Sequence, residues 1–561
     1  MILRWIKKHW LLSALLFIFL YLVIGATAPF YHYKPVSDIT KASISAAGFY
    51  QDGDGVDRAM ILETNQSAWD ERMRLMSLAQ ERIILSTFDF RDGESPRDIM
   101  AVMLHKADEG VKVQILVDGF SGMVRMERNN FFYALSSHPN IEIKLYNKMN
   151  FLLPWRTQGR MHDKYVIADD HGYILGGRNT FDYFIGSYPT SSRSHDREVL
   201  IYNTASGTGE SSQSSLNQVT DYFNGVWNLE VSTLFHEDGK LAEKAAVMEA
   251  ADVLRKRYET LARTYPELLE WDSKNGDTPG APSVSLETPP VSPELPPASP
   301  NTPPDAFGLP TDASPSDVCG TLPGQPACPA IPIDASINDD DADIPAYDRM
   351  DSLDYYEIHT VPTGKITLVS NPASIYGKEP IVFHTMTELM KHAREQVVIH
   401  TPYAVFNDTM YDALSEVTQQ VPVTMMINSV ENGDNFFASS DYPRHKKNFI
   451  NTGMEILEYD GGLSYHGKSL LIDDELCAVG SYNFDLRSTY LDTELMLVIQ
   501  SPRLTAQLKE YMDTYQHDCR RLLPDGTYEI PEHVTVAPVP FYKKAAWKAV
   551  GFLMQPFRFL I

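Results

Sequence analysis

The sequence is poor in basic residues and in cysteine. These shortages argue against nucleic-acid binding and against a metal site. It has 48 Lys and Arg against 74 Asp and Glu, which gives a formal net charge of −26. A chain this acidic repels phosphate backbones, so nucleic acid is a poor candidate partner. The chain has only four cysteines in 561 residues, and no compact set of His, Cys and carboxylate residues has the spacing of a metal site. We therefore expect no bound metal and no other cofactor.

Much of the acidity is concentrated in one segment. Residues 272–357 contain 16 acidic and 2 basic residues, and 17 of the 36 prolines fall between residues 279 and 345. Such a composition cannot offset the entropy of ordering with buried apolar surface. We therefore predict a disordered, Pro/Asp-rich linker at residues 269–352. Within it, Cys319 and Cys328 fit either a local disulfide or two unpaired thiols.

A long apolar run lies near the N-terminus, from Trp10 to Ala26, behind three basic residues. Its length is near the lower limit for crossing a bilayer. The basic flank predicts a cytoplasmic N-terminus, which puts the rest of the chain on the extracytoplasmic side of the cell membrane. We favour a retained anchor within residues 1–30. The alternative is a signal peptide cleaved near Ala28, after which the chain is exported.

The segments on either side of the linker repeat one another in outline. Each has an apolar strand pattern, an amphipathic helix pattern and a second strand pattern: residues 82–87, 97–110 and 111–119 in the first segment, and 396–403, 408–420 and 421–429 in the second. Strands that alternate with helices predict an α/β fold with mainly parallel sheets covered by helices. The repetition predicts an internal duplication, with a first lobe at residues 40–268 and a second at residues 353–535.

The repeat becomes specific at a set of chemically active residues. The stretches "MHDKYVIADDHGYILGGRN" (161–179) and "YHGKSLLIDDELCAVGSYN" (465–483) carry five residue types at identical offsets. They are His162, Lys164, Asp169, Gly176 and Asn179 in the first copy, and His466, Lys468, Asp473, Gly480 and Asn483 in the second. Downstream, "DREV" (196–199) corresponds to "DTEL" (492–495). A single histidine near a strand end is more often structural than catalytic, but a constellation matched twice is hard to attribute to chance.

The spacing predicts where these side chains point. Residues two apart on a strand share a face, so each histidine and its lysine point the same way. The apolar runs on either side of the aspartate form the arms of a hairpin, and with Lys468 opposite Gly480 the chain returns Asn483 beside His466. The same arithmetic brings Asn179 beside His162. The glycine before each asparagine would leave room for a ligand to approach the backbone.

These groups suit a tetrahedral phosphate. Lysine and asparagine donate to the non-bridging oxygens, while one imidazole attacks phosphorus and the other protonates the departing alkoxide. Glu198 and Glu494 are placed to accept from the distal ring nitrogens and fix the tautomers. Asp169 and Asp473 fall at the hairpin turns, where they either take part in the site or brace the structure. A neighbouring lysine repels cations, which disfavours metal binding by either histidine.

At these residues the chain resembles the phospholipase D superfamily, whose signature is H-x-K-x(4)-D followed by G-[GS]-x-N, and it looks most like bacterial cardiolipin synthases of the type C group. The likeness covers residues 80–200 and 355–500, and the first copy has Gly177 where the second has Ser481. It implies two pseudo-symmetric phospholipase D-like α/β/α lobes packed around one active site, which a monomer completes. It implies a metal-independent transphosphatidylase that works through a phosphatidyl-histidine, with His162 as nucleophile and His466 as general acid and then base.

The resemblance also implies site roles for further residues. The catalytic set would be His162, Lys164, Asp169, His466, Lys468 and Asp473, and the substrate-binding set would be Asn179, Asn483 and Ser481.

Two apolar segments favour a lipid substrate. "NFLLPW" (150–155) lies shortly before His162, either exposed or as a buried loop. The C-terminal segment 536–561 mixes Lys543, Lys544, Lys548 and Arg558 with aromatic and aliphatic residues, which is typical of an interfacial helix on an anionic bilayer. The alternative for this segment is docking on its own domain.

We therefore predict a phosphatidyltransferase that makes cardiolipin from phosphatidylglycerol and a second phospholipid, either phosphatidylglycerol or phosphatidylethanolamine. A first alternative is a phospholipase D-type hydrolase that acts on lipid or, less favoured, on nucleic acid. A second is a non-catalytic binding protein with a decaying site, which two complete signatures disfavour. Residue spacing leaves transfer against hydrolysis open, because water and a lipid hydroxyl can meet the same intermediate.

Overall fold

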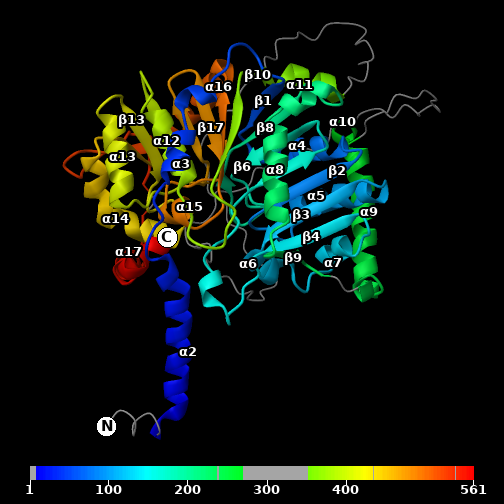
Figure 1. Cartoon of the computed structure of the whole chain (residues 1–561), viewed down its shortest axis with the longest axis horizontal. Coiled ribbons are helices and arrows are strands. Elements are labelled where there is room, and N and C mark those ends of the chain that lie inside the picture. The colour runs from blue at the N-terminus through cyan, green and yellow to red at the C-terminus, as the bar shows by residue number, and fades with distance from the viewer. Residues whose placement is uncertain (1–7, 237–238, 270–351, 434, 537) are drawn as a thin grey trace.

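A computed structural model of the chain describes residues 8–236, 239–269, 352–433, 435–536 and 538–561 (Figure 1). The predicted linker, with Cys319 and Cys328, lies almost wholly outside the described residues. On either side of it the chain forms two α/β lobes, each built on a nine-stranded sheet. The predicted fold class, two lobes of repeated α/β structure, is confirmed.

The strands of the two sheets follow the same spatial plan. In the first sheet the order is β10 (Val361–Pro362), β1 (Asp57–Leu62), β8 (Glu198–Asn203), β6 (Gly172–Gly176), β5 (Tyr165–Ala168), β2 (Arg82–Thr87), β3 (Lys112–Asp118), β4 (Ile141–Tyr146) and β9 (Ser232–Leu234). In the second it is β11 (Ile366–Ser370), β18 (Leu495–Gln500), β17 (Leu476–Gly480), β16 (Ser469–Ile472), β12 (Val397–His400), β13 (Val423–Asn428), β14 (Glu455–Tyr459), β19 (Cys519–Leu522) and β20 (Tyr528–Glu529).

The expectation of mainly parallel sheets is wrong. Among the described strands, β2–β3 and β3–β4 are parallel in the first sheet and β12–β13 and β13–β14 in the second, and the other neighbours run antiparallel. Alternating strand and helix patterns predict the βαβ units around these pairs correctly. They say nothing of the hairpins and returning strands that complete each sheet.

Helices cover both faces of each sheet. The outer helices share a buried apolar cluster with one face: α4 (Asn65–Ser77), α5 (Glu94–Asp108), α7 (Asn130–Ser136), α9 (Ala245–Thr264) and α10 (Pro266–Leu269) in the first lobe, and α12 (Ile381–Met390), α13 (Asp408–Thr418) and α14 (Phe436–Asn451) in the second. The predicted helices at residues 97–110 and 408–420 correspond to α5 and α13. Local capping fixes several starts: the Asn407 side chain, for example, accepts from Met410 N at the start of α13.

A further apolar cluster joins the two lobes. It contains residues of both sheets together with α8 (Leu216–Trp227) and α16 (Pro502–His517), which lie on the remaining faces. Phe223 and Leu508 within it are fully buried, and each such side chain contributes about 1.5–3 kcal/mol by leaving water. The lobes therefore pack as one body, which fixes the position of anything built between them.

Two segments pack against a different lobe from the one that the predicted domain bounds give them. One follows the linker, and the other follows the N-terminal helix. Helix α11 (Ser352–His359) and β10 return to the first lobe, where β10 pairs with β1 and Tyr356 enters the core. Conversely, Phe30 and Phe49 enter the core of the second lobe. Neither the start of the second lobe at residue 353 nor the start of the first at residue 40 matches this packing.

Helix α2 (Trp10–Thr27) projects away from the lobes (Figure 1). Within Trp10–Phe30 an 18-residue window has a mean hydropathy of 2.4, and none of that window is buried inside the protein. By length and composition this helix can cross a membrane, and a signal sequence would have the same character.

The C-terminal helix α17 (Phe541–Leu553) docks on the second lobe. Trp547 is buried in the core of that lobe, and the Arg558 guanidinium pairs with the Asp441 carboxylate at 2.9 Å. Phe541 and Phe552 stay exposed on the helix. The docking alternative therefore describes α17, and its exposed aromatic side remains available to a lipid surface.

Candidate active site

In each lobe the histidine of the repeat, His162 or His466, lies just before the predicted hairpin and not within it. Ser469 pairs with Val479 in β16–β17, which puts Lys468 opposite Gly480, and Gly480 N donates to Lys468 O at 3.3 Å. In the first lobe Gly176 N donates to Lys164 O at 3.2 Å. The predicted hairpin register is present in both lobes.

The glycines in these hairpins serve the sheet and not a ligand. A Cβ atom at Gly480 would lie 2.1 Å from the carbonyl oxygen of Leu495, and one at Gly176 would lie 2.5 Å from that of Arg197. Both contacts are to the next strand of the same sheet. The expectation that these glycines make room for a ligand is therefore wrong.

The segment that leads into each histidine pairs with the opposite lobe. Strand β15 (Ser464–Tyr465) runs parallel to β7 (Ser194–His195), and His466 N donates to His195 O at 2.5 Å. On the other side Met161 forms a bridge to Thr493, and His162 N donates to Thr493 Oγ1 at 3.1 Å. These interlobe strand contacts hold both histidines at the junction of the lobes.

Each histidine receives a carboxylate from the other lobe. His466 Nδ1 lies 2.7 Å from Asp196 Oδ2, and His162 Nδ1 lies 2.9 Å from Glu494 Oε1. The two copies use different acids because their registers differ: Tyr465 pairs with the residue before Asp196, whereas Met161 pairs with the residue before Glu494. A proton shared between His162 Nδ1 and Glu494 would leave Nε2 of that ring able to react, whereas Nε2 of His466 lies 3.3 Å from Lys468 Nζ.

Glu198 does not contact either histidine, contrary to expectation. Its two carboxylate oxygens accept from Arg72 Nη1 and Nη2 at 2.7 and 2.6 Å, in a fully buried pair. Asp196, which takes the expected role, was missed. The signal lay in the sequence as the first residue of "DREV", but only the interlobe register shows which acid of that stretch reaches a ring.

Both lysines of the repeat are buried beside their histidines. Lys164 Nζ donates to His162 O at 2.6 Å. Lys468 Nζ lies 2.5 Å from His466 Nδ1 and 3.7 Å from Asp196 Oδ2. Each lysine is 1% exposed, so two potential cations are held inside the junction.

The surroundings make the two histidines electrostatically unequal. Burial, followed by the charge of Lys164, holds the pKa of His162 well below its usual value of 6.5. Burial likewise raises the pKa of Glu494 to about 7 and lowers that of Lys164 to about 7. Burial alone would raise the pKa of Asp196, but the charges of Lys468 and His466 bring it down to about 2. Near pH 7 the His162 ring is therefore neutral, and His466 faces an ionised carboxylate.

Asp169 and Asp473 brace the hairpin turns and lie outside the site, so their assignment as catalytic residues is corrected. The Asp169 carboxylate accepts from the backbone N–H groups of residues 80–82, and the Asp473 carboxylate accepts from those of residues 394–396. Both residues have positive φ, 47° and 53°, a region that aspartate tolerates better than most residues. Each ties its turn to the start of a neighbouring strand.

The expected substrate-binding residues divide into two groups. Asn179 Oδ1 accepts from Asp89 N at 3.2 Å, and Asn483 Nδ2 is 3.4 Å from Ser488 Oγ. Within the described residues Asn483 Oδ1 is buried without a hydrogen-bond partner, and Asn483 lines the cavity at His162. Ser481 instead donates to Glu494 Oε2 at 2.5 Å and is fully buried. Ser481 was expected to contact substrate, but its hydroxyl instead holds Glu494, the acid that contacts His162.

Two cavities lie at this side of the junction, and His162 lines one of them. One, of about 380 Å³, is lined by His162, Phe88, Tyr403, Asn483 and Arg487, among others. A second, of about 760 Å³, is mostly apolar and lies between the body and α2. Phe88 and Arg487 line both.

The fold and this junction define a class of protein. Two duplicated α/β lobes present one histidine and one buried lysine each, and every histidine is oriented by the other lobe. Such a junction can attack a phosphodiester on one side and protonate the leaving oxygen on the other.

Comparison with known families agrees. The family model described as "Cardiolipin synthase, PLD-like domain" matches residues 73–227 and 386–515, just over half of the chain. The protein belongs to this family, and the resemblance to the phospholipase D superfamily is confirmed.

The similarity to individual relatives is either low over most of the chain or higher over a short stretch. An uncharacterized protein of Helicobacter pylori (strain ATCC 700392 / 26695) is 21% identical over 499 residues, which cover 82% of this chain and 80% of that protein. Cardiolipin synthase A of Yersinia pseudotuberculosis serotype O:1b (strain IP 31758) is 32% identical over 148 residues, which are 26% of this chain and 30% of that one. The crystal structure of phosphatidylserine synthase from Haemophilus influenzae Rd KW20 covers 93% of this chain and 100% of its own, with a TM-score of 0.53 at 14% identity. That likeness shows a shared fold.

Proposed function

We propose that the protein is a phospholipid phosphatidyltransferase that makes cardiolipin from phosphatidylglycerol and a second phospholipid. The observation that carries the proposal is the pair of histidines at the lobe junction, with His162 Nδ1 on Glu494 and His466 Nδ1 on Asp196. Membership of the family supports it, as does the local similarity to a cardiolipin synthase A.

In the proposed first step, His162 Nε2 attacks the phosphorus of the donor lipid. The bond from phosphorus to the headgroup alcohol breaks, and His466 gives its proton to the departing oxygen, which releases glycerol from phosphatidylglycerol or ethanolamine from phosphatidylethanolamine. In the second step a hydroxyl of phosphatidylglycerol gives its proton to His466 and attacks phosphorus. The phosphorus–nitrogen bond breaks, cardiolipin leaves, and both rings return to their starting states.

The electrostatics support this order of roles. A neutral His162, kept so by burial and by Lys164, has a free lone pair for attack. His466 lies against the ionised carboxylate of Asp196, which stabilises its protonated form. Lys164, Lys468 and the asparagines are the groups that would bind the non-bridging oxygens.

A phospholipase D-type hydrolase would use the same first step and then water. Aromatic rings lie against both histidines and disfavour this alternative: the centroid of Phe88 is 5.3 Å from that of His162, and the centroid of Phe184 is 5.1 Å from that of His466. A junction lined in this way limits access of water to the intermediate and leaves the acceptor lipid as the favoured partner.

The proposed setting is the cell membrane. Helix α2 would anchor the chain, with the lobes on the extracytoplasmic side; cleavage of that segment would instead release an exported enzyme. A monomer would suffice, because both lobes come from one chain.

The test uses the full chain in vesicles of phosphatidylglycerol, alone or mixed with phosphatidylethanolamine, with products measured by mass spectrometry. We expect cardiolipin from the wild type and none from His162→Ala or His466→Ala. Phosphatidic acid without cardiolipin would select the hydrolase, and cleavage of added DNA would select a nuclease. Wild-type activity in either alanine variant would overturn the mechanism.

Two further arms test the intermediate and the metal independence. Rapid denaturation in alkaline SDS, which preserves the acid-labile phosphorus–nitrogen bond, should leave label from a phosphorus-labelled donor on the wild type and not on His162→Ala. Activity should survive EDTA. Among the described residues, the three-member cluster that could hold a metal is His517, Asp518 and His533, and it contains none of the residues that line the two cavities.

A further inference from the structure

We infer that the apolar cavity beside α2 holds an acyl chain of the phospholipid whose phosphate reaches His162, so that the membrane helix forms one wall of the substrate entrance. This inference rests on the proposed function and adds to it the place where the lipid tail binds. The cavity has a volume of about 760 Å³, within the roughly 300–1,000 Å³ typical of ligand cavities.

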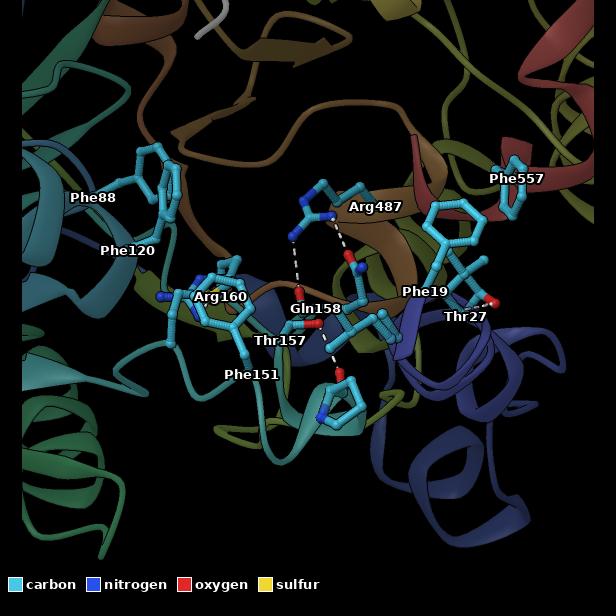
Figure 2. Close-up of a pocket in the computed structure, with 15 residues that line it drawn as sticks. Phe19, Thr27, Phe88, Phe120, Phe151, Thr157, Gln158, Arg160, Arg487 and Phe557 are labelled. Atoms are coloured by element: carbon cyan, nitrogen blue, oxygen red, sulfur yellow. Dashed lines mark hydrogen bonds between the residues drawn. The ribbon is translucent and has the colours of Figure 1, made fainter. Parts of the chain in front are cut away.

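The two walls of this cavity are apolar and come from distant parts of the chain. One is the C-terminal half of α2, and the other includes the loop at residues 149–158 (Figure 2). The apolar lining residues are Phe19, Leu22, Val23 and Ala26 from α2, and Phe88, Phe120, Met149, Phe151, Pro154 and Phe557 from the body.

Specific contacts fix α2 against this loop. The Tyr21 hydroxyl donates to Leu152 O at 2.7 Å. Gly25 allows the close approach of the short helix η4 (Pro154–Arg156), since a Cβ at Gly25 would lie 2.4 Å from Pro154 Cγ. The wall is therefore a built contact between a helix able to cross a membrane and the catalytic body.

The cavity borders the active site. Phe88 and Arg487 line both it and the cavity that contains His162. Arg487 is fixed at this junction, because its Nη2 donates to Gln158 O at 2.8 Å (Figure 2) and its Nε pairs with Asp492 at 2.9 Å. Arg160 and Arg487 are the cationic side chains of the lining. The walls thus change from apolar at α2 to cationic near His162, which matches a lipid with its tail toward the membrane and its phosphate toward the histidine.

The rim of the entrance is apolar and exposed. Phe151 and Leu152 are 66% and 79% exposed, beside the end of α2. The "NFLLPW" stretch is therefore exposed at these two residues, not a buried loop. Apolar side chains beside a membrane helix insert into the lipid interface, which would open the cavity directly to the bilayer.

A pair of adjacent substitutions on α2 tests the inference. Val23 lines the cavity, whereas Ile24 is 57% exposed and is absent from its lining. Val23→Phe fills the cavity, and Ile24→Phe adds the same ring on the lipid side. Both are assayed in vesicles of dioleoyl-phosphatidylglycerol and with water-soluble dihexanoyl-phosphatidylglycerol.

We expect Val23→Phe to lower the rate with dioleoyl lipid by about tenfold, because each methylene kept from an apolar site loses a factor of about four in affinity. Its rate with dihexanoyl lipid, which has less chain to place in the cavity, should fall less, and Ile24→Phe should resemble the wild type with both lipids. Equal rates for the two variants on dioleoyl lipid would overturn the inference. If the wild type makes cardiolipin from neither lipid, the result would instead count against the proposed function.

A binding readout separates the cavity from catalysis. Phosphatidylglycerol with a diazirine at the end of one acyl chain, irradiated in vesicles with the full chain, should label residues 149–158 in the wild type and in Ile24→Phe. Labelling there should fall in Val23→Phe. Ala26→Leu, a smaller filling on the same wall, repeats the comparison if Val23→Phe is less stable. Unchanged labelling in both filled variants would refute the binding site whether or not the enzyme turns over.

Discussion

Asp196→Asn tests the electrostatic pairing between the lobes, because it keeps the shape of the side chain and removes its charge. In the wild type the Asp196 carboxylate contacts His466 Nδ1 at 2.7 Å and lies 3.7 Å from Lys468 Nζ, and all three groups are buried. Asparagine would remove the negative charge that faces these two potential cations. We expect lower stability and a lower rate of transfer.

The size of the stability effect follows from the pKa of Asp196, which is about 2 in the folded chain against an ordinary value of 3.8. At 1.36 kcal/mol for each unit, the ionised carboxylate contributes about 2 kcal/mol at pH 7. Because the folded pKa is depressed, this contribution is present above pH 4 and is lost as pH falls from about 4 to about 2. If the same energy stabilises protonated His466 during transfer, the rate falls by about 30-fold.

Urea unfolding of the detergent-solubilised chain, followed by tryptophan fluorescence, measures the first effect at pH 7 and pH 3. The difference between wild type and Asp196→Asn should shrink at the lower pH. Asp169→Asn is the matched control: it loses backbone hydrogen bonds at the hairpin turn and costs about 1–3 kcal/mol, but the folded fraction should transfer phosphatidyl groups at the wild-type rate.

Two results would refute this reasoning. One is an unfolding free energy for Asp196→Asn equal to that of the wild type at pH 7. The other is a rate loss in Asp169→Asn as large as that in Asp196→Asn, which would mean that the loss reports general disturbance of the hairpins and not the charge beside His466.

Three further predictions concern the same junction. Glu494→Gln should lower the rate of transfer because Glu494 holds His162, whereas Glu198→Gln should lower the unfolding free energy through Arg72 with less effect on the rate per folded molecule; equal rate losses would contradict the assignment. The rate of transfer should fall as pH rises through about 7, since Lys164 loses its charge there, and Lys164→Met should be slow with no such fall; a flat wild-type profile from pH 6 to 8 would count against a role for this charge. Gly177→Ser should slow transfer more than Ser481→Gly does, because a Cβ at residue 177 would lie 2.2 Å from Asp196 Oδ1; steady-state rates of the two variants decide this.

The parts of the fold that sequence predicts are those set by neighbours along the chain. The strand and helix patterns before each histidine follow from local periodicity, and the hairpin register follows from counting residues between Lys468 and Gly480. Strand direction across the sheets and the exchange of segments such as β10 between lobes depend on contacts far apart in the sequence. The positions of Asp169 and Asp473 at hairpin turns are consistent with a bracing role. The resemblance to the family implies a catalytic role, and their contacts in the structure support bracing.

The choice of acid beside each histidine shows why the site itself needs the three-dimensional structure. Asp196 and Asp492 occupy equivalent places in the repeat, yet Asp196 reaches His466 while Asp492 pairs with Arg487. The cause is the two-residue difference in register between the contacts of Tyr465 and Met161.

That difference also accounts for the departure from exact repetition at Gly177 and Ser481. Where Asp196 approaches the backbone, only glycine fits; where Glu494 stands instead, Ser481 supplies a hydrogen bond to it. A duplicated chain thus becomes asymmetric at the two rings to which the proposed mechanism assigns different protonation states. The double variant Gly177→Ser with Ser481→Gly should therefore disturb the carboxylate contacts of both His162 and His466. The rest of each hairpin should keep its structure.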